Sequence, residues 1–478
     1  MTDVSLPRRR GLPPLLLAIL YAAAVLLPLA FSAATGEAHR QISMQAAAAT
    51  GTVAAAMILL QMVTSGRFEV ISGRIGIDVT MAFHKWAAPL ALAFALAHVA
   101  FLVGLPDAER PARFARRLEI FLTADSLGDA RLALILLALL VVMALLRDRL
   151  PMRYQVWRAS HALGAVALVA LLVWHVLGDG RMGPMGLALW IGFGLAVTLP
   201  ALWIYAKRLT RPATDCWTVA AIRKVTPRIW EMTLENPAGQ PLAFRAGQFV
   251  WASVGGRRLP LHDHPFSIAS APHERQLRLL IQEAGDFTSS LAAVTPGTRV
   301  GIDGPHGSFG LGDAPRGGLV LIAGGVGIAP ILSILRDVAR RGSDVPVRFA
   351  YSVHDVADLI PKALYRPALK ALGITPLLTA TTGTGDGVAR GRLGPEQMTQ
   401  LLDGLDPART DVLICGPGPL MTSLTDTLAG LGVPLSRIDY ERFSYGAGTL
   451  SAKDKRRLGA VGLLFAALTA AIAAYSLA

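Results

Sequence analysis

The chain has 478 residues, of which 53% are hydrophobic, and it carries a formal net charge of +13. This hydrophobic fraction excludes an ordinary soluble protein and predicts that part of the chain lies in lipid. The positive charge does not indicate nucleic-acid binding, because the arginines are scattered among membrane flanks and soluble loops without interleaved aromatic residues; attraction to anionic lipid headgroups explains the charge better.

Near-continuous apolar runs in the first 206 residues predict six membrane-spanning helices. The first run lacks a small-residue cleavage site, and further spans follow it, so we expect it to stay as a helix rather than be removed as a signal peptide. The connection at 105–129 is expected to hold a surface helix. The six runs cover residues 12–34, 43–63, 79–104, 130–146, 159–177 and 185–206.

Arginines before the first span and between the fourth and fifth spans set the predicted orientation. The positive-inside rule places both segments in the cytoplasm, so the odd-numbered spans run outward and the third and fifth are parallel. The arginines concerned are Arg8, Arg9 and Arg10, and then Arg147, Arg149, Arg153 and Arg158.

Four histidines share one spacing on the third and fifth predicted spans. His84 and His98 lie fourteen residues apart, and His161 and His175 repeat that interval. In a helix, fourteen residues cover roughly 21 Å and return to within about 40° of the same face. If the two helices pack side by side, His84 can face His161 and His98 can face His175, so that each pair clamps a haem iron. Two stacked haems would then bridge a bilayer roughly 30 Å thick.

Polar residues in membrane helices also serve as proton relays or hydrogen-bond neighbouring helices. The matched spacing on two helices favours haem, because the other six histidines show no comparable pattern; His39, His273 and His354 are expected in solvated positions. Lys85 and Arg158 lie beside the inner pair. They could pair with haem propionates or simply anchor the helices at the interface.

From 213 to 312, short alternating segments broken by glycine and proline turns predict a small antiparallel barrel. One segment, His264-Pro265-Phe266-Ser267, could stack on and hydrogen-bond a flat ring. A second, Gly285-Asp286-Phe287-Thr288, could approach a diphosphate closely. Either segment alone also fits ordinary turn chemistry. Two cysteines, Cys216 and Cys415, are too few for an iron–sulfur cluster, a zinc site or a disulfide framework, so an electron carrier must be haem or flavin.

An apolar strand at 319–323 leads into a glycine-rich turn and then a helix at 331–340. Strand, glycine turn and helix form a phosphate cradle, because glycines let the backbone meet a pyrophosphate and the helix N-terminus favours negative charge. Further strands at 347–351 and 411–414 alternate with helices, which predicts a parallel sheet covered on both faces. The turn reads Gly324-Gly325-Val326-Gly327-Ile328-Ala329-Pro330, and the last strand ends in Cys415-Gly416-Pro417.

The helical core, the barrel and the nucleotide domain, in this order, resemble the ferric reductase and NADPH oxidase superfamily over about 12–447. The resemblance implies two b-type haems, with His84 and His161 holding the inner one and His98 and His175 the outer one. It implies FAD in the barrel, with Ser267 near the flavin ring and the diphosphate at Thr288. The residues implied to bind FAD are His264, Pro265, Phe266, Ser267, Gly285 and Thr288.

The same resemblance implies that NADPH or NADH binds at the glycine turn, with the nicotinamide close to Cys415. Glu441-Arg442-Phe443 resembles the family's terminal segment, whose aromatic residue covers the flavin. Ser267, Cys415 and Phe443 are therefore the expected catalytic positions. The residues implied to bind the nucleotide are Gly324, Gly325, Gly327, Pro330, Cys415, Gly416 and Pro417.

The chain departs from the family pattern after residue 447, because a basic stretch at 453–457 leads into an apolar run at 458–478. This run predicts a seventh span rather than a tail packed on the soluble half. The expected architecture is a multidomain membrane protein. Its parts are a six-helix di-haem bundle at 12–207, an antiparallel FAD barrel at 213–312, a doubly wound α/β nucleotide domain at 316–447 and a C-terminal transmembrane helix at 458–478.

The protein is expected to be a multi-pass oxidoreductase of a bacterial inner membrane, with its flavin and nucleotide domains in the cytoplasm. Electrons would pass from NAD(P)H through FAD and the inner and outer haems to oxygen, giving superoxide, or to a ferric chelate. A membrane electron donor to a periplasmic redox protein is an alternative. So is a member of another class, a non-enzymatic nucleotide-responsive sensor or transporter whose histidines move protons.

The sequence leaves the choice between NADPH and NADH open. The stretch that ends the second strand, 351–355, has no arginine for a 2′-phosphate, although Arg390 or Arg392 could supply one from elsewhere. Asp355 would instead favour the free ribose hydroxyl of NADH.

Overall fold

A computed structural model describes most of the chain, and the chain divides into two compact units. One unit comprises Leu12–Ile71, Val79–Arg208 and Gly459–Ala478; the other contains Ser72–Asp78 and Leu209–Leu458. The described residues are 12–35, 41–65, 68–104, 111–178, 183–210, 216–255, 262–312, 316–441 and 450–477.

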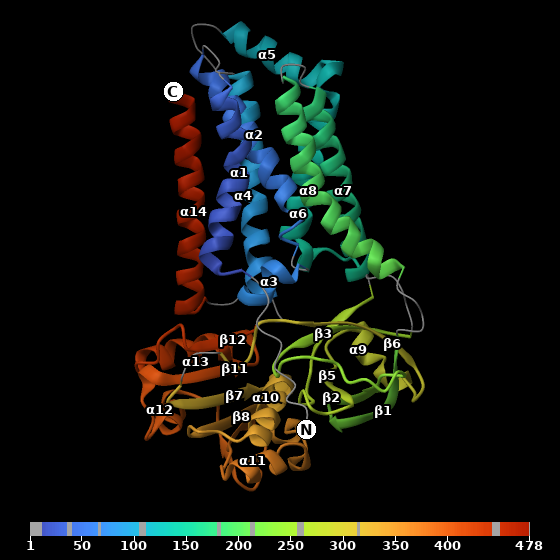
Figure 1. Ribbon diagram of the computed structural model, residues 1–478, viewed down its shortest axis with the longest axis vertical. Coiled ribbons are helices and arrows are strands. Elements are labelled where there is room, and N and C mark those ends of the chain that lie inside the picture. The colour runs from blue at the N-terminus through green and yellow to red at the C-terminus, as the bar shows by residue number, and fades with distance from the viewer. Residues whose placement is uncertain are drawn as a thin grey trace. The chain divides into compact units, whose positions relative to one another are not determined.

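Seven helices in the described part are long and apolar enough to cross a membrane, and each predicted run falls on one of them. The largest differences are at the starts of two helices, which begin at Tyr154 rather than 159 and at Ala452 rather than 458, because a helix can continue into polar sequence beyond the apolar run. Figure 1 shows the long helices side by side. They are α1 (Pro14–Ala34), α2 (Ile42–Leu60), α4 (Ile77–Val103), α6 (Gly128–Leu145), α7 (Tyr154–Gly178), α8 (Pro184–Leu209) and α14 (Ala452–Leu477).

Helix α2 is the most enclosed of these helices, because 67% of the residues in its apolar stretch are buried. Its sequence is rich in alanine, including buried Ala47, Ala54 and Ala56. Small side chains let neighbouring helices approach closely in a membrane bundle. Two shorter helices are α3 (Glu69–Ile75) and α5 (Pro111–Thr123), and α5 lies where the surface helix was predicted.

The C-terminal part of α14 packs on the helical unit. Phe465 stacks on Phe83 with 5.9 Å between ring centroids. Near its end, the Tyr475 hydroxyl lies 3.0 Å from Ser32 Oγ, and Gln45 Nε2 donates to the Tyr475 carbonyl over 2.7 Å. The predicted seventh helix is therefore an integral member of the bundle.

The first sheet is antiparallel throughout, with the order β4-β3-β6-β1-β2-β5. A further bridge between Ile268 and Leu279 joins the segment after β4 to β5, so that the sheet closes on itself around a buried core. The prediction of a small antiparallel barrel is confirmed. Its elements are β1 (Trp217–Thr226), β2 (Ile229–Glu235), β3 (Phe249–Val254), β4 (His264–Ser267), β5 (Leu277–Gln282), the short helix α9 (Asp286–Ser289) and β6 (Arg299–His306).

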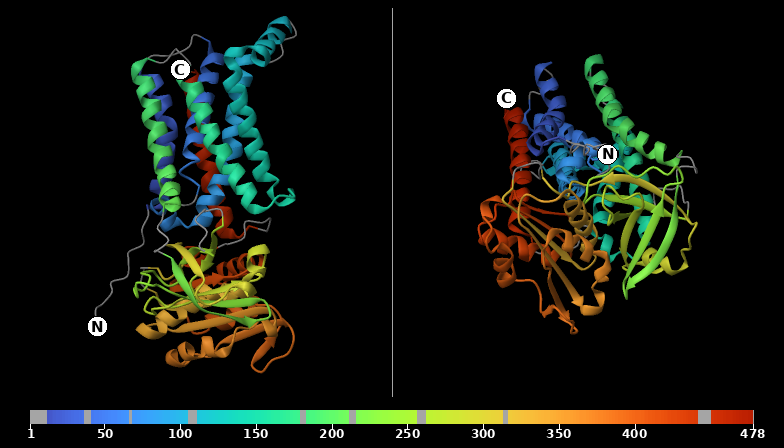
Figure 2. Two further views of the ribbon diagram at one scale, coloured as in Figure 1. Left: turned by 90° about the vertical axis from the view of Figure 1, so that its right-hand side faces the viewer. Right: turned by 60° about the horizontal axis from the view of Figure 1, so that its bottom comes forward.

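The second sheet is parallel throughout, with the order β10-β9-β8-β7-β11-β12. Figure 2 shows its strands in gold to orange-red beside helices of similar colours. Helices α10 (Ile328–Arg341) and α11 (Arg366–Leu372) pack on one face, and α12 (Pro395–Leu402) and α13 (Gly418–Gly430) on the other. The strand order reverses between β7 and β11, the position where doubly wound sheets bind ligands. The strands are β7 (Gly318–Gly324), β8 (Val347–Asp355), β9 (Leu377–Thr382), β10 (Val388–Arg390), β11 (Thr410–Cys415) and β12 (Ile438–Tyr440).

The barrel and the parallel sheet, predicted as separate segments, share one hydrophobic core. Helix α10 joins them directly. Ser333 Oγ donates to the Ser270 carbonyl over 2.7 Å, and Arg336 Nη1 donates to the Ala269 carbonyl over 3.1 Å. The helix that follows the glycine turn is thereby fixed against the segment that follows β4.

Candidate functional site

The first histidines of α4 and α7 lie close together. His84 and His161 are near enough for the charge of one ring to act on the other. Only one span, α6, separates the two helices along the chain, so α4 and α7 run in the same direction. His98 and His175 each lie roughly 21 Å further along their helices. The helical unit can therefore present two stacked histidine pairs.

In two of these histidines, a contact with α2 or the turn that follows it orients the Nδ1 atom. His98 Nδ1 donates to the Ala47 carbonyl over 2.7 Å, and His84 Nδ1 lies 3.3 Å from Thr64 Oγ1. Metal-binding histidines commonly engage their second nitrogen in this way, because the contact fixes the tautomer and the ring orientation.

The two histidines of α7 differ from each other. His161 stacks on Trp157 with 5.3 Å between ring centroids and an interplanar angle of 14°. Its Nδ1 is buried and has no hydrogen-bond partner among the described residues. His175 Nδ1, in contrast, lies 3.5 Å from Asp129 Oδ2.

The donor set fits haem better than a bare metal ion. In the described ranges, no group of three or more histidine, cysteine, aspartate or glutamate side chains could hold a metal ion. Paired imidazoles suit the two axial positions of a haem iron. Gly51 on α2 faces one ring so closely that an added Cβ would lie 2.5 Å from His98 Nδ1. The residues present therefore fit a haem pair, with a glycine making room for a ligand.

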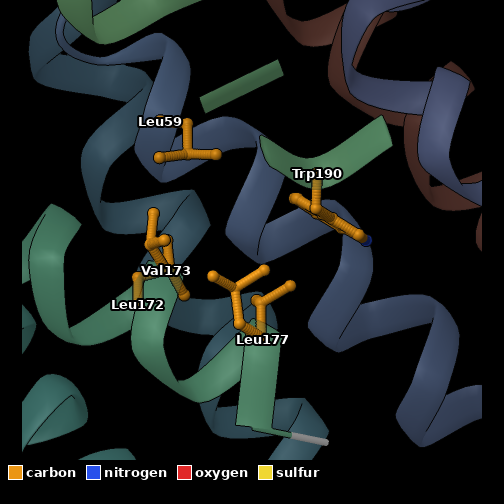
Figure 3. Close-up of a pocket in the computed structure, with 6 residues that line it drawn as sticks. Leu59, Leu172, Val173, Leu177 and Trp190 are labelled. Atoms are coloured by element: carbon orange, nitrogen blue, oxygen red, sulfur yellow. The ribbon is translucent and has the colours of Figure 1, made fainter. Parts of the chain in front are cut away.

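A small apolar cavity lies among α2, α7 and α8 (Figure 3). Its volume of roughly 10 Å³ holds at most one water. Its α7 lining residues lie about 130° around the helix from His175. We interpret the cavity as a packing gap outside the histidine pairs. It is lined by Leu59, Leu172, Val173, Val176, Leu177 and Trp190.

The barrel brings its two predicted flavin segments together. His264 of β4 stacks on Phe287 of α9 with 4.3 Å between ring centroids and an interplanar angle of 6°. Thr288 Oγ1 accepts hydrogen bonds from the backbone N–H groups of Ala284 and Gly285 over 2.8 Å and 3.0 Å. The hydroxyl predicted to meet the diphosphate is thus engaged in ordering its own turn.

Phe249, Gly307 and Glu441 lie near one another beside β4. Ser267 pairs with buried Phe249 on β3. An added Cβ on Gly307 would lie 3.0 Å from the Phe249 ring and 3.1 Å from Glu441 Oε1. Glu441 also acts electrostatically on Cys415. A series of neighbouring residues thus leads from Ser267 through Phe249 and Glu441 to Cys415, and the catalytic roles of Ser267 and Cys415 stay predictions.

The carboxyl group of Glu441 is 3% exposed, and neither oxygen has a hydrogen-bond partner among the described residues. Burial, together with the charges of Asp78 and Asp439, raises the pKa of this carboxyl group well above its usual range. Burial also raises the pKa of the Cys415 thiol, which stays neutral rather than acting as a nucleophile. Sequence reasoning placed Glu441 in the terminal segment but missed its burial; its position directly after β12 was the available signal.

Glu441→Gln is expected to remove a pH dependence of stability. The carboxyl pKa is higher in the folded than in the unfolded chain, so its contribution favours folding at low pH and is lost as pH rises from about 4.5 through the raised pKa. Between about pH 5 and about pH 8, the melting temperature should fall less in the variant than in the wild type. Glu396→Gln, at an exposed position of α12, is the control. Equal falls in all three proteins would show that Glu441 is not held protonated.

The glycine turn meets the end of β11. Cys415 pairs with Ala323 in the parallel ladder. An added Cβ on Gly327 would lie 2.2 Å from the Cys415 carbonyl oxygen, and one on Gly416 would lie 3.0 Å from the Gly324 Cα. Both predicted nucleotide segments therefore lie backbone against backbone at the carboxyl edge of the sheet, with Pro330 in the first turn of α10.

Six other predicted residues complete the comparison with the sequence. Phe443 and His39 lie outside the described residues. His273 and His354 are exposed, as expected. Lys85 is exposed and Arg158 is half-buried, and the roles of both residues at haem propionates stay predictions.

Three family models match the chain in the predicted order. Residues 50–172 match a ferric reductase like transmembrane component, 217–309 an FAD-binding domain and 321–426 an oxidoreductase NAD-binding domain. The chain belongs to the ferric reductase and NADPH oxidase superfamily. Three of the paired histidines lie within the first match, and His175 lies just beyond it. These domains make the protein a multi-pass membrane oxidoreductase that uses NAD(P)H.

The chain is similar to the reductase component of propane 2-monooxygenase from Gordonia sp. (strain TY-5), at 30% identity over 49% of this chain and 69% of that protein. It is also similar to the electron transfer subunit of dihydroorotate dehydrogenase B (NAD(+)) from Geobacillus thermodenitrificans (strain NG80-2), at 29% identity over 49% and 86%. Among solved structures, a ferredoxin reductase in carbazole 1,9a-dioxygenase aligns with a TM-score of 0.42 and 22% identity over 48% and 69%.

Proposed function

We propose that the protein carries electrons from NAD(P)H, through FAD and two b-type haems, to an acceptor on the opposite side of the membrane. The observation that carries this proposal is the close approach of His84 and His161, each followed fourteen residues later by a second histidine. The membrane-flanking arginines support a cytoplasmic position for the flavin and nucleotide domains.

FAD, when bound, accepts a hydride from nicotinamide and passes electrons singly to haem iron. The chain's own residues bind and orient these groups. The glycine turn and Cys415-Gly416-Pro417 hold the nucleotide at the sheet edge. His264 and Phe287 shape the flavin site, and Glu441 places a buried carboxyl group with a raised pKa beside Gly307.

We also propose that NADH is the preferred nucleotide. Asp355 ends β8, and its Oδ1 and Oδ2 accept hydrogen bonds from Ala357 N over 2.9 Å and Thr382 Oγ1 over 2.7 Å. These contacts hold a carboxylate where such sheets bind the adenosine ribose. A carboxylate there accepts a bond from the ribose 2′-hydroxyl and repels a 2′-phosphate.

Replacing Asp355 with serine is expected to lower the ratio of kcat/KM for NADH over NADPH by roughly tenfold. Asp358→Ser, three residues further along, is the matched control and should leave the ratio unchanged. An unchanged ratio in Asp355→Ser, or a wild-type preference for NADPH, would contradict this role.

The acceptor is proposed to be oxygen or a ferric chelate. One relative is a reductase component and the other an electron transfer subunit, which supports a periplasmic redox partner as the second candidate. A non-enzymatic sensor or transporter would bind nucleotide without transferring electrons across the membrane.

Proteoliposomes with the nucleotide site facing outward test the proposal. NADH added outside should reduce a ferric chelate trapped inside, or generate trapped superoxide that superoxide dismutase removes. If the trapped acceptor is reduced only when a periplasmic protein fraction is also enclosed, the protein would instead be an electron donor to a periplasmic redox partner. Nucleotide binding with no electron transfer to any trapped acceptor would contradict the proposal.

A further inference from the structure

His175, the proposed outer-haem ligand, faces a carboxylate to which the sequence pattern gave no role. Its Nδ1 lies 3.5 Å from Asp129 Oδ2, and the two side chains are 37% and 22% exposed. Asp129 lies in the first turn of α6 and His175 in the last turn of α7. These two helices pack against each other within the same unit.

The arginine nearest to Asp129 in the sequence does not pair with it in the described contacts. Arg131, two residues further along, donates instead to the carbonyls of Phe121 over 2.9 Å and Ala124 over 2.8 Å, at the end of α5. The N-terminus of α6 also favours a negative charge in its first turn. Asp129 therefore offers an anionic acceptor to the Nδ1–H of His175.

The four proposed ligand histidines differ in the group that contacts their Nδ1 atom. His161 has no partner among the described residues, and His84 meets a threonine hydroxyl. His98 donates to a backbone carbonyl, and His175 alone among the four meets a carboxylate in the described contacts. A carboxylate partner makes an imidazole more basic. A more basic ligand stabilises ferric over ferrous iron, which lowers the reduction potential.

We propose that Asp129 is a positioning residue that orients His175 and lowers the reduction potential of the outer haem. This inference rests on the proposed haem sites. A lower potential at the last carrier makes it a stronger one-electron donor to whatever accepts electrons outside the membrane.

The test is an anaerobic redox titration of the full-length protein in lipid nanodiscs, followed by haem absorbance and by the electron paramagnetic resonance of the ferric state. The variants are Asp129→Asn and Asp129→Glu, with Asp125→Asn as the control at an exposed position nearby. The outer haem is assigned by its absence from His98→Ala.

In Asp129→Asn, the outer haem should titrate at a more positive potential with altered resonance positions, while the inner haem is unchanged. Asp129→Glu should stay close to the wild type, and Asp125→Asn should match it. Loss of the outer haem from Asp129→Asn but not from Asp129→Glu would also support the positioning role. Two retained haems with wild-type potentials and resonances in Asp129→Asn would overturn it. A wild-type protein without two haems would overturn the haem assignment itself.

Discussion

Replacing His98 with alanine is expected to reduce the haem content from two to one per chain and to bring transmembrane electron transfer down to the background rate. The imidazole that would hold the outer haem is lost, and removing one carrier would break a path that spans roughly 30 Å. Reduction of FAD by the nucleotide should continue, because its binding segments lie in the other compact unit. Haem content by pyridine haemochrome and flavin absorbance measure the two effects separately.

His273→Ala, at an exposed position, is the matched control and should retain both haems. Gly51→Ala provides a subtler probe of the same ring, because its Cβ would lie 2.5 Å from His98 Nδ1 and must displace it. Gly192→Ala on α8 meets no atom within 4 Å and should have no effect. A His98→Ala protein with two haems would show that this histidine is not a ligand.

Replacing Gly327 with alanine is expected to weaken nucleotide binding by roughly 10- to 100-fold, because overpacking costs about 1–3 kcal/mol. The added Cβ would lie 2.2 Å from the Cys415 carbonyl oxygen and 2.7 Å from the Gly416 amide nitrogen. The backbone must therefore move at the point where the two nucleotide segments meet. The measurement is the rate of flavin reduction as a function of NADH concentration.

Gly418→Ala is the control for this change, since its Cβ, at the first residue of α13, would meet nothing within 4 Å. Chemical reduction of the haems by dithionite should be normal in both variants, which separates a nucleotide defect from misfolding. Normal flavin reduction in Gly327→Ala would contradict the assignment of the glycine turn as the nucleotide cradle.

Elements with a strong local pattern could be predicted from the sequence. Apolar runs long enough to cross a bilayer identified all seven long helices, and glycine after an apolar strand identified the turn between β7 and α10. The spacing of His84 and His98, repeated on α7, predicted two histidine pairs. In the structure the rings of His84 and His161 interact electrostatically, and haem binding stays a prediction. These signals are periodic or contiguous in the chain, so they need no knowledge of tertiary contacts.

The features that were missed depend on contacts between residues far apart in sequence. Asp129 looks like a loop carboxylate until α6 packs on α7 and brings it to His175. Glu441 looks like an ordinary charged residue until burial beside Gly307 removes its water. The shared core of the barrel and the parallel sheet likewise arises only when α10 packs between them. No sequence window contains both partners of any of these contacts.

Anaerobic mixing of the purified full-length protein with NADH, followed by a reduced-minus-oxidised absorbance spectrum, tests the central claim most directly. The account predicts that flavin absorbance is lost first and that the bands of two low-spin b-type haems then appear. In His98→Ala, only one haem should become reduced. Flavin reduction with no haem bands in the wild-type protein, or haem bands unaffected by replacement of any of the four histidines, would contradict the account.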